Sequence, residues 1–146
     1  MSSEMVVTDS ITIDAPPSRV WETLVNPAMT RKYMFDCEAL SDWKPGSRLD
    51  WKGATDGNVY VTGKVVEVVH GRQLSYTVFD PNGGLKDVPE NYLTVTYSLS
   101  ESDGGTRLDV SQGDYAKVED GRKRYEDTVN GWGMILNKIK EIAEEK

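Results

Sequence analysis

Residues 120–145 read DGRKRYEDTVNGWGMILNKIKEIAEE, and the spacing of their apolar side chains decides the fold class. Apolar residues recur at steps of 4, 3, 4, 3 and 4, in a series made of Tyr125, Val129, Trp132, Leu136, Ile139 and Ala143. This spacing predicts one amphipathic helix of about 25 residues, about 37 Å long at 1.5 Å per residue. Charged residues occupy the opposite side, so we expect the helix to lie on a sheet rather than inside a helix bundle.

The chain before this helix is rich in predicted strands separated by turn residues. Alternating apolar residues and β-branched runs predict seven strands, at residues 5–13, 36–40, 47–53, 59–69, 73–80, 91–100 and 106–113. Short turns join most of them, which favours an antiparallel meander. In residues 59–69 the apolar face changes parity, from Val61 and Val65 to Val66 and Val68, and this indicates a β-bulge that curves the sheet.

Two short helices are predicted between the first and second strands. Pro17 suits the first turn of a helix, and the apolar residues that follow it lie on one helical face. Asn26 and Pro27 end this helix, and a second one is predicted over residues 28–33. The whole order predicts a single α+β domain over residues 1–146, in which a curved antiparallel sheet of six to seven strands is covered by the long C-terminal helix.

Charge and composition exclude several classes of partner. The formal net charge is −7, and a chain this acidic is a poor match for the phosphates of nucleic acid or for an anionic membrane surface. The one basic cluster, Arg122-Lys123-Arg124, is flanked by acidic residues, and we interpret it as a solvated turn of helix rather than a phosphate site.

The chain has the features of a cytoplasmic protein without a membrane span. The N-terminal residues Met1-Ser2-Ser3-Glu4 lack the basic start and apolar run of a signal peptide. No apolar stretch approaches the ~18 residues that a membrane helix requires. Cys37 is the only cysteine, which excludes an internal disulfide and points to a reducing compartment.

Residues for catalysis or for metal binding are scarce. The only histidine, His70, falls in a predicted hairpin turn, and Cys37 lies between Asp36 and Glu38, which would raise the pKa of its thiol. One Cys and one His cannot form a structural zinc site, and the glycine pairs read as hairpin turns rather than as a phosphate loop. We therefore predict no catalytic residue, metal or cofactor, although acid–base chemistry by a pair among the 24 acidic residues stays open.

The aromatic residues point to a binding cavity between the sheet and the C-terminal helix. Trp and Tyr give an apolar wall with a few polar atoms, as a small-molecule site requires. The predicted ligand-binding residues are Trp51, Val61, Tyr76, Val78, Tyr97, Val110, Trp132 and Leu136. Gly131 and Gly133 flank Trp132, where the missing side chains would let the helix approach the sheet or a ligand approach the helix. Simple core packing is the alternative for each aromatic, and the loop at residues 80–90 is either a lid or a plain hairpin loop.

The predicted elements follow the order one strand, two short helices, six strands and one long helix. Within this order, three segments resemble the activator-of-Hsp90-ATPase homologue 1-like family. They are PSRVWETLVNP at residues 17–27, GKVVEVV at 63–69 followed by RQLSYT at 72–77, and Gly131-Trp132 with Leu136, Ile139 and Lys140. The family belongs to the START-like (SRPBCC) superfamily, so the resemblance implies the helix-grip fold. It also implies binding of a small apolar or amphipathic molecule such as a lipid, hormone or polyketide, and supplies no catalytic set.

Two other functions stay open from the resemblance. One is an enzyme of the same fold, of the cyclase, dehydratase or hydrolase type. The other is an interaction module for a protein partner such as a chaperone. Eukaryotic Hsp90 activators pair this domain with an N-terminal domain that grips the chaperone, whereas the first strand here begins about five residues into the sequence. We therefore do not expect this chain to activate Hsp90 directly.

Overall fold

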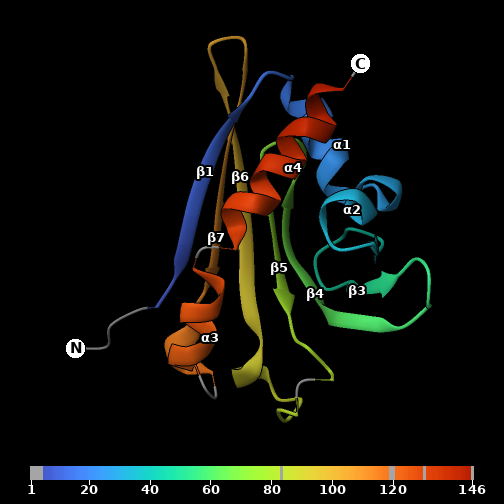
Figure 1. The fold of residues 1–146 in the computed structure, drawn as a ribbon, viewed down its shortest axis with the longest axis vertical. Helices are drawn as coiled ribbons and strands as arrows, with labels where there is room; N and C mark the ends of the chain where they lie inside the picture. The colour runs from blue at the N-terminus through green and yellow to red at the C-terminus, as the bar shows by residue number, and fades with distance from the viewer. Residues whose placement is uncertain (1–4, 83, 119–120, 130, 146) are drawn as a thin grey trace.

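A seven-stranded antiparallel sheet forms the body of the protein, and the helices lie on its concave face (Figure 1). The computed structural model describes residues 5–82, 84–118, 121–129 and 131–145. The strands are β1 (Val7–Ile13), β2 (Cys37–Leu40), β3 (Arg48–Gly53), β4 (Val59–Val69), β5 (Gln73–Val78), β6 (Leu93–Ser102) and β7 (Gly105–Gly113). They are arranged in the order β1-β7-β6-β5-β4-β3-β2. The predicted α+β class and the antiparallel sheet are confirmed.

Side chains alternate across the sheet as the sequence pattern predicts. In β6 the residues Leu93, Val95, Tyr97 and Leu99 are buried, and those between them are not. In β7 Leu108 and Val110 are buried beside them, with Tyr97 paired to Val110 and Leu99 to Leu108. One face of the central strands therefore forms the core, and the other faces solvent.

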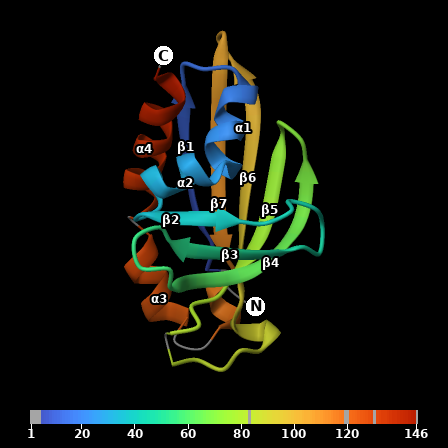
Figure 2. The ribbon, with the colours of Figure 1, turned by 90° about the vertical axis from the view of Figure 1, so that its right-hand side faces the viewer.

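The sheet curls strongly, so that β2, β3 and the first part of β4 run across the direction of β5, β6 and β7, while the rest of β4 runs beside β5 (Figure 2). The pairing of β4 with β5 shifts register between Val65 and Glu67, which confirms the predicted bulge. Val65 is buried, whereas Val66 turns outward and is 51% exposed. At Gly63 the two strands come so close that an added Cβ would lie 1.8 Å from the carbonyl oxygen of Thr77. The bulge and this close approach together bend β4.

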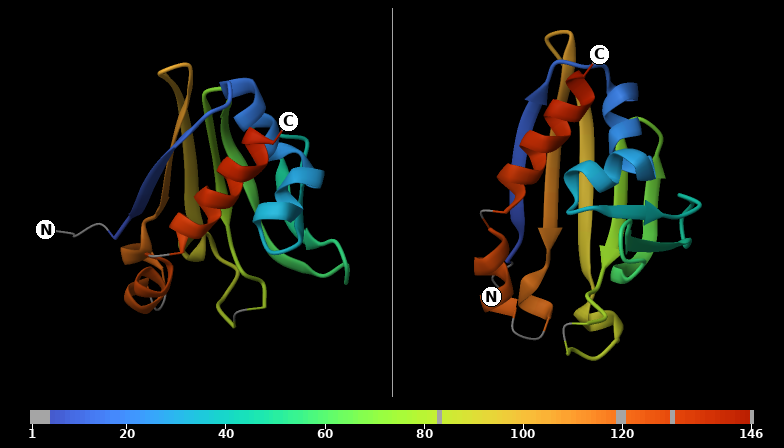
Figure 3. Two further views of the ribbon diagram at one scale, coloured as in Figure 1. Left: turned by 45° about the horizontal axis from the view of Figure 1, so that its top comes forward. Right: turned by 45° about the vertical axis from the view of Figure 1, so that its right-hand side comes forward.

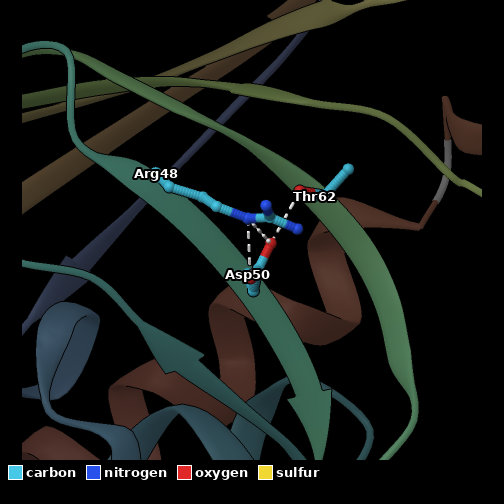
Figure 4. A network of polar contacts seen from close by, with 3 residues as sticks. All are labelled: Arg48, Asp50 and Thr62. Atoms are coloured by element: carbon cyan, nitrogen blue, oxygen red, sulfur yellow. Dashed lines mark hydrogen bonds and ion pairs between the residues drawn. The ribbon is translucent and has the colours of Figure 1, made fainter. Parts of the chain in front are cut away.

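A polar cluster on β3 and β4 supports the same corner (Figure 4). The carboxylate of Asp50 accepts a hydrogen bond of 2.6 Å from the Thr62 hydroxyl, opposite it on β4, and one of 2.9 Å from Arg48 Nε. Arg48 is largely exposed, so its ion pair adds little to stability. The next pair in the register is Trp51 with Val61, and the cluster therefore aligns these two neighbours.

Two short helices, α1 (Pro17–Val25) and α2 (Pro27–Tyr33), follow β1 as predicted. The side-chain oxygen of Asn26 accepts a hydrogen bond of 2.9 Å from the Ala28 amide and so caps α2. Tyr33, at the end of α2, is buried and donates its hydroxyl to the Leu24 carbonyl. Within the described residues no helix is long and apolar enough to cross a membrane.

The C-terminal segment is two helices, α3 (Gly121–Thr128) and α4 (Trp132–Glu144), and the prediction of one continuous helix was wrong. The expected start at Asp120 lies outside the described residues. At the break, the Thr128 hydroxyl donates back to the Arg124 carbonyl and the Gly131 amide donates to the Thr128 carbonyl. A hydroxyl bonded to the preceding turn bends a helix, and Gly131 and Gly133 weaken helical order on either side of Trp132. Val129 leaves the apolar stripe and is 40% exposed.

Of the two C-terminal helices, α4 supplies the apolar face that covers the sheet. Its buried side chains are Trp132, Leu136, Ile139, Ile142 and Ala143, and the helix contacts β1, α1 and α2. Arg19 on α1 donates to the carbonyls of Ala143 and Ile142 in the last turn of α4, and the Ile142 carbonyl also accepts from the Glu145 amide. Figure 3 shows α3 displaced from α4 toward the far end of β7.

Candidate functional site

A cavity of about 660 Å³ opens between the curled sheet and the two C-terminal helices. Its floor comes from β3 to β7, one side from the connection between α2 and β2, and the other side from α3 and α4. Most of the lining is apolar, with Leu93, Val95 and Ile135 among the lining side chains. The volume falls within the range of about 300–1,000 Å³ that small-molecule sites occupy.

The eight residues predicted for this site fall into two groups. Those that line the cavity are Trp51, Val61, Tyr76, Val78 and Trp132. The other three, Tyr97, Val110 and Leu136, do not line it, and each is at most 2% exposed. Tyr97 and Val110 share the concave face of the sheet with lining residues, but α4, which carries Leu136, covers that end of the sheet and closes it into core.

A row of aromatic rings connects the cavity with this core. The ring centroids of Trp51 and Tyr76 lie 5.9 Å apart, those of Tyr76 and Tyr97 lie 6.2 Å apart, and Tyr97 meets Trp132 edge-on at 5.9 Å. Burial raises the pKa of the Tyr76 and Tyr97 hydroxyl groups well above the ordinary tyrosine value. Both therefore stay protonated at neutral pH, and they offer neutral hydrogen-bonding groups rather than bases.

The two tryptophans of the cavity differ in how their indole nitrogens are satisfied. Trp132 Nε1 donates a hydrogen bond of 2.9 Å to the side-chain oxygen of Gln112 on β7. Trp51 Nε1 is buried and has no partner among the described residues. Buried donors are nearly always hydrogen-bonded, so an unpaired one beside a cavity marks a position where a ligand acceptor fits.

A matched pair of variants tests this difference. Both Trp51→Phe and Trp132→Phe remove the same volume, but only the second leaves the Gln112 oxygen without its donor. We expect Trp132→Phe to lower the free energy of unfolding by about 1 kcal/mol more than Trp51→Phe does. Urea unfolding followed by circular dichroism measures both values. Equal losses would show that the Trp132–Gln112 hydrogen bond contributes nothing to stability.

The mouth of the cavity combines exposed apolar and acidic side chains. Phe35 is 70% exposed, Met134 52% and Tyr60 43%, and all three line the cavity. Four exposed aspartates also line it, namely Asp36, Asp56, Asp80 and Asp127. Hydrogen bonds from the Tyr60 hydroxyl and the Asn58 amide lower the pKa of Asp56, so its carboxylate is charged at neutral pH.

One lining residue, Arg124 on α3, was misjudged from the sequence. The basic cluster is exposed at Arg122 and Lys123, as predicted, but Arg124 is half-buried, lines the cavity and has a buried Nη1 without a partner. Helical spacing within α3 could have found it, because Arg124 stands four residues before Thr128, which also lines the cavity.

The remaining candidates lie as follows. Cys37 is buried at the cavity wall, and its pKa is raised first by burial and then by Asp36 and Asp56, so the thiol is not activated. His70 is exposed and packs at a tilt against the ring of Trp21, and it does not line the cavity. Of the described part of the 80–90 loop, Asp80 lines the cavity. The described residues contain no group of three His, Cys, Asp or Glu side chains able to hold a metal ion.

Comparison with known proteins places the chain in a family. Residues 14–144 match the family described as "Activator of Hsp90 ATPase homolog 1-like protein". No match is found among curated proteins. The solution structure of ChR145 from Cytophaga hutchinsonii is 32% identical over 99% of this chain and 97% of its own, with a TM-score of 0.78.

Two more distant structures share the fold. Protein MLL2253 from Mesorhizobium loti is 23% identical, with coverage of 94% of this chain and 95% of its own and a TM-score of 0.76. The Aha1 dimer from Colwellia psychrerythraea is 14% identical, with coverage of 95% and 96% and a TM-score of 0.72. Since the family match spans almost the whole domain, the chain belongs to the activator of Hsp90 ATPase homologue 1-like family.

Proposed function

We propose that this protein binds a small, mostly apolar molecule in the cavity between the sheet and the C-terminal helices. The observation that carries the proposal is the buried Trp51 Nε1, an unpaired donor in the wall of an apolar cavity of about 660 Å³. An apolar enclosure with a few placed polar atoms is the usual design of a small-molecule site.

The empty volume itself supports binding rather than plain core packing. Protein interiors are packed as densely as organic crystals, so an open space of this size differs from plain core packing. The chain could have filled this space with larger residues at Val61, Val78 or Val95, all of which line it. Exposed Phe35 and Met134 at the mouth give an apolar molecule a route of entry.

Catalysis has less support from the lining residues. A general acid or base works best with a pKa near the operating pH. The pKa of Tyr76 is raised by burial and that of Asp56 is lowered by its hydrogen bonds, so both are shifted away from neutrality. The cavity is therefore better suited to holding a molecule than to moving its protons.

A second candidate is a chaperone-associated interaction module. It is favoured by the family description and by the exposed apolar side chains of Phe35, Tyr60 and Met134 around one opening. Stimulation of the ATPase of Hsp90 by this chain, lost on Phe35→Ser, would support this candidate. Unchanged ATPase activity in the presence of the chain would contradict it.

Ligand-dependent stabilisation tests the main proposal. A library of apolar and amphipathic molecules is screened for a rise in melting temperature and for a change in tryptophan fluorescence. We expect a true ligand at a hundred times its Kd to raise the melting temperature by about 5–10 °C. The control is Val78→Phe, which fills part of the cavity and should reduce the shift while the variant stays folded. A library without any stabilising molecule would contradict the proposal.

A further inference from the structure

Two buried polar atoms of the cavity wall have no partner among the described residues, and both are hydrogen-bond donors. Trp51 Nε1 is an indole N–H, and Arg124 Nη1 belongs to a guanidinium, so neither can accept a hydrogen bond. The Gln112 oxygen already accepts from Trp132, which leaves the NH₂ group of that amide, another donor. A ligand complementary to these groups must bring acceptor oxygens.

Arg124 adds a positive charge to this set of donors. Burying part of a charged group without a partner is unfavourable, and a half-buried arginine is normally paired. Arg124 forms no ion pair within the part of the chain that the structure describes, although Asp127 follows three residues later and also lines the cavity. By contrast Arg122, on the same helix, is exposed and pairs with Glu126 at 3.5 Å.

The four aspartates at the mouth do not take the place of this missing partner. All four are exposed, and charges that are exposed to water are largely screened beyond about 8 Å at physiological salt. A carboxylate held against a partly buried guanidinium is screened much less, because little water lies between the two. Arg124 Nη1 is therefore a buried charged donor that a ligand oxyanion can reach, whereas the exposed aspartates mainly affect how quickly an anion enters.

We propose that the ligand carries a carboxylate or similar oxyanion on an apolar body, and that Arg124 binds this group while Trp51 donates a second hydrogen bond. The inference rests on the proposed binding function and names the chemical class of the ligand. The apolar body would lie along the aromatic rings of Trp51 and Tyr76 on the floor and of Trp132 on the α4 side.

Two matched pairs of probes test the class of ligand. Decanoate is compared with decan-1-ol, and 2-naphthylacetate with 2-(2-naphthyl)ethanol, by isothermal titration calorimetry on the wild type and on Arg124→Gln. We expect the variant to weaken binding of the carboxylates about tenfold and binding of the alcohols less than twofold. Arg122→Gln is the matched control on the same helix, and it should leave all four affinities unchanged.

The stability of the ligand-free protein separates a binding role from a structural one. If the role of Arg124 is to bind a ligand, Arg124→Met removes an unpaired charge and should raise the melting temperature of the ligand-free protein. If Arg124 instead supports the fold, the same variant should lower it, and the inference is overturned.

The outcomes also distinguish this inference from the function on which it rests. Alcohols that bind as tightly as the carboxylates, with no effect of Arg124→Gln, would overturn the inference and leave apolar ligand binding intact. If none of the four probes binds, both are contradicted. Arg124→Lys keeps the charge but loses the planar pair of donors, so partial recovery of carboxylate binding would support the assignment.

Discussion

Replacing Gly63 with alanine is expected to lower the free energy of unfolding by about 3 kcal/mol, a fall in melting temperature of about 6–12 °C. The added Cβ would lie 1.8 Å from the Thr77 carbonyl oxygen and 2.5 Å from its carbon. These are backbone atoms of the neighbouring strand, so β4 and β5 must separate where the sheet turns its corner. Thermal and urea unfolding of the variant measure the loss.

A glycine without such a neighbour serves as the control. A Cβ at Gly133 would lie 3.7 Å from Asp9 Oδ2, an ordinary contact, so close approach to the sheet does not require glycine there. Gly133→Ala should therefore stabilise α4 by about 0.5–1 kcal/mol, because alanine favours the helix. A Gly63→Ala variant as stable as Gly133→Ala would show that β4 and β5 can separate at no cost.

Truncation of Leu136 to alanine is expected to destabilise the protein by about 2–5 kcal/mol while ligand affinity stays unchanged. Leu136 is 1% exposed and packs in the core beneath α4, outside the cavity lining. Its removal leaves a void that the sheet and helix cannot close. Chemical unfolding gives the stability, and titration with a ligand found in the screen gives the affinity.

For Met134, two residues earlier on the same helix, we expect the opposite effects on stability and on ligand affinity. It is 52% exposed and lines the cavity, so Met134→Ala should change stability little and weaken ligand binding. If Leu136→Ala also abolishes ligand binding at a temperature where the variant remains folded, Leu136 belongs to the binding site and the prediction is wrong.

Much of the fold could be predicted because its signals are local. The alternation in β6, the parity change in β4 and the proline-led helices α1 and α2 each follow from a few neighbouring residues. The break between α3 and α4 could not be read from the same spacing. The break depends on the hydrogen bond from the Thr128 hydroxyl to the Arg124 carbonyl and on two glycines. These outweigh the apolar repeat, in which Val129 is 40% exposed.

The cavity was harder to predict than the fold. Alternation shows which side chains face the helices, so the sequence placed Trp51, Tyr76 and Tyr97 on one surface. It cannot show where α4 begins, and the start of this helix decides which part of the surface is core and which part is cavity. Tyr97 lies on the covered side and Trp51 on the open side. Arg124 was missed because charged neighbours made its segment look uniformly solvated.

The division of the C-terminal segment has an evolutionary consequence. Helix α4 carries the buried side chains that secure the sheet, whereas in α3 only Gly121 is buried and several exposed positions face solvent or the cavity. If the cavity binds a ligand as proposed, mutations in α3 can therefore alter which molecule is admitted while the buried side chains of α4 keep the sheet covered. Related proteins should diverge fastest in α3 and retain the apolar pattern of α4, so that new specificities arise on an inherited scaffold.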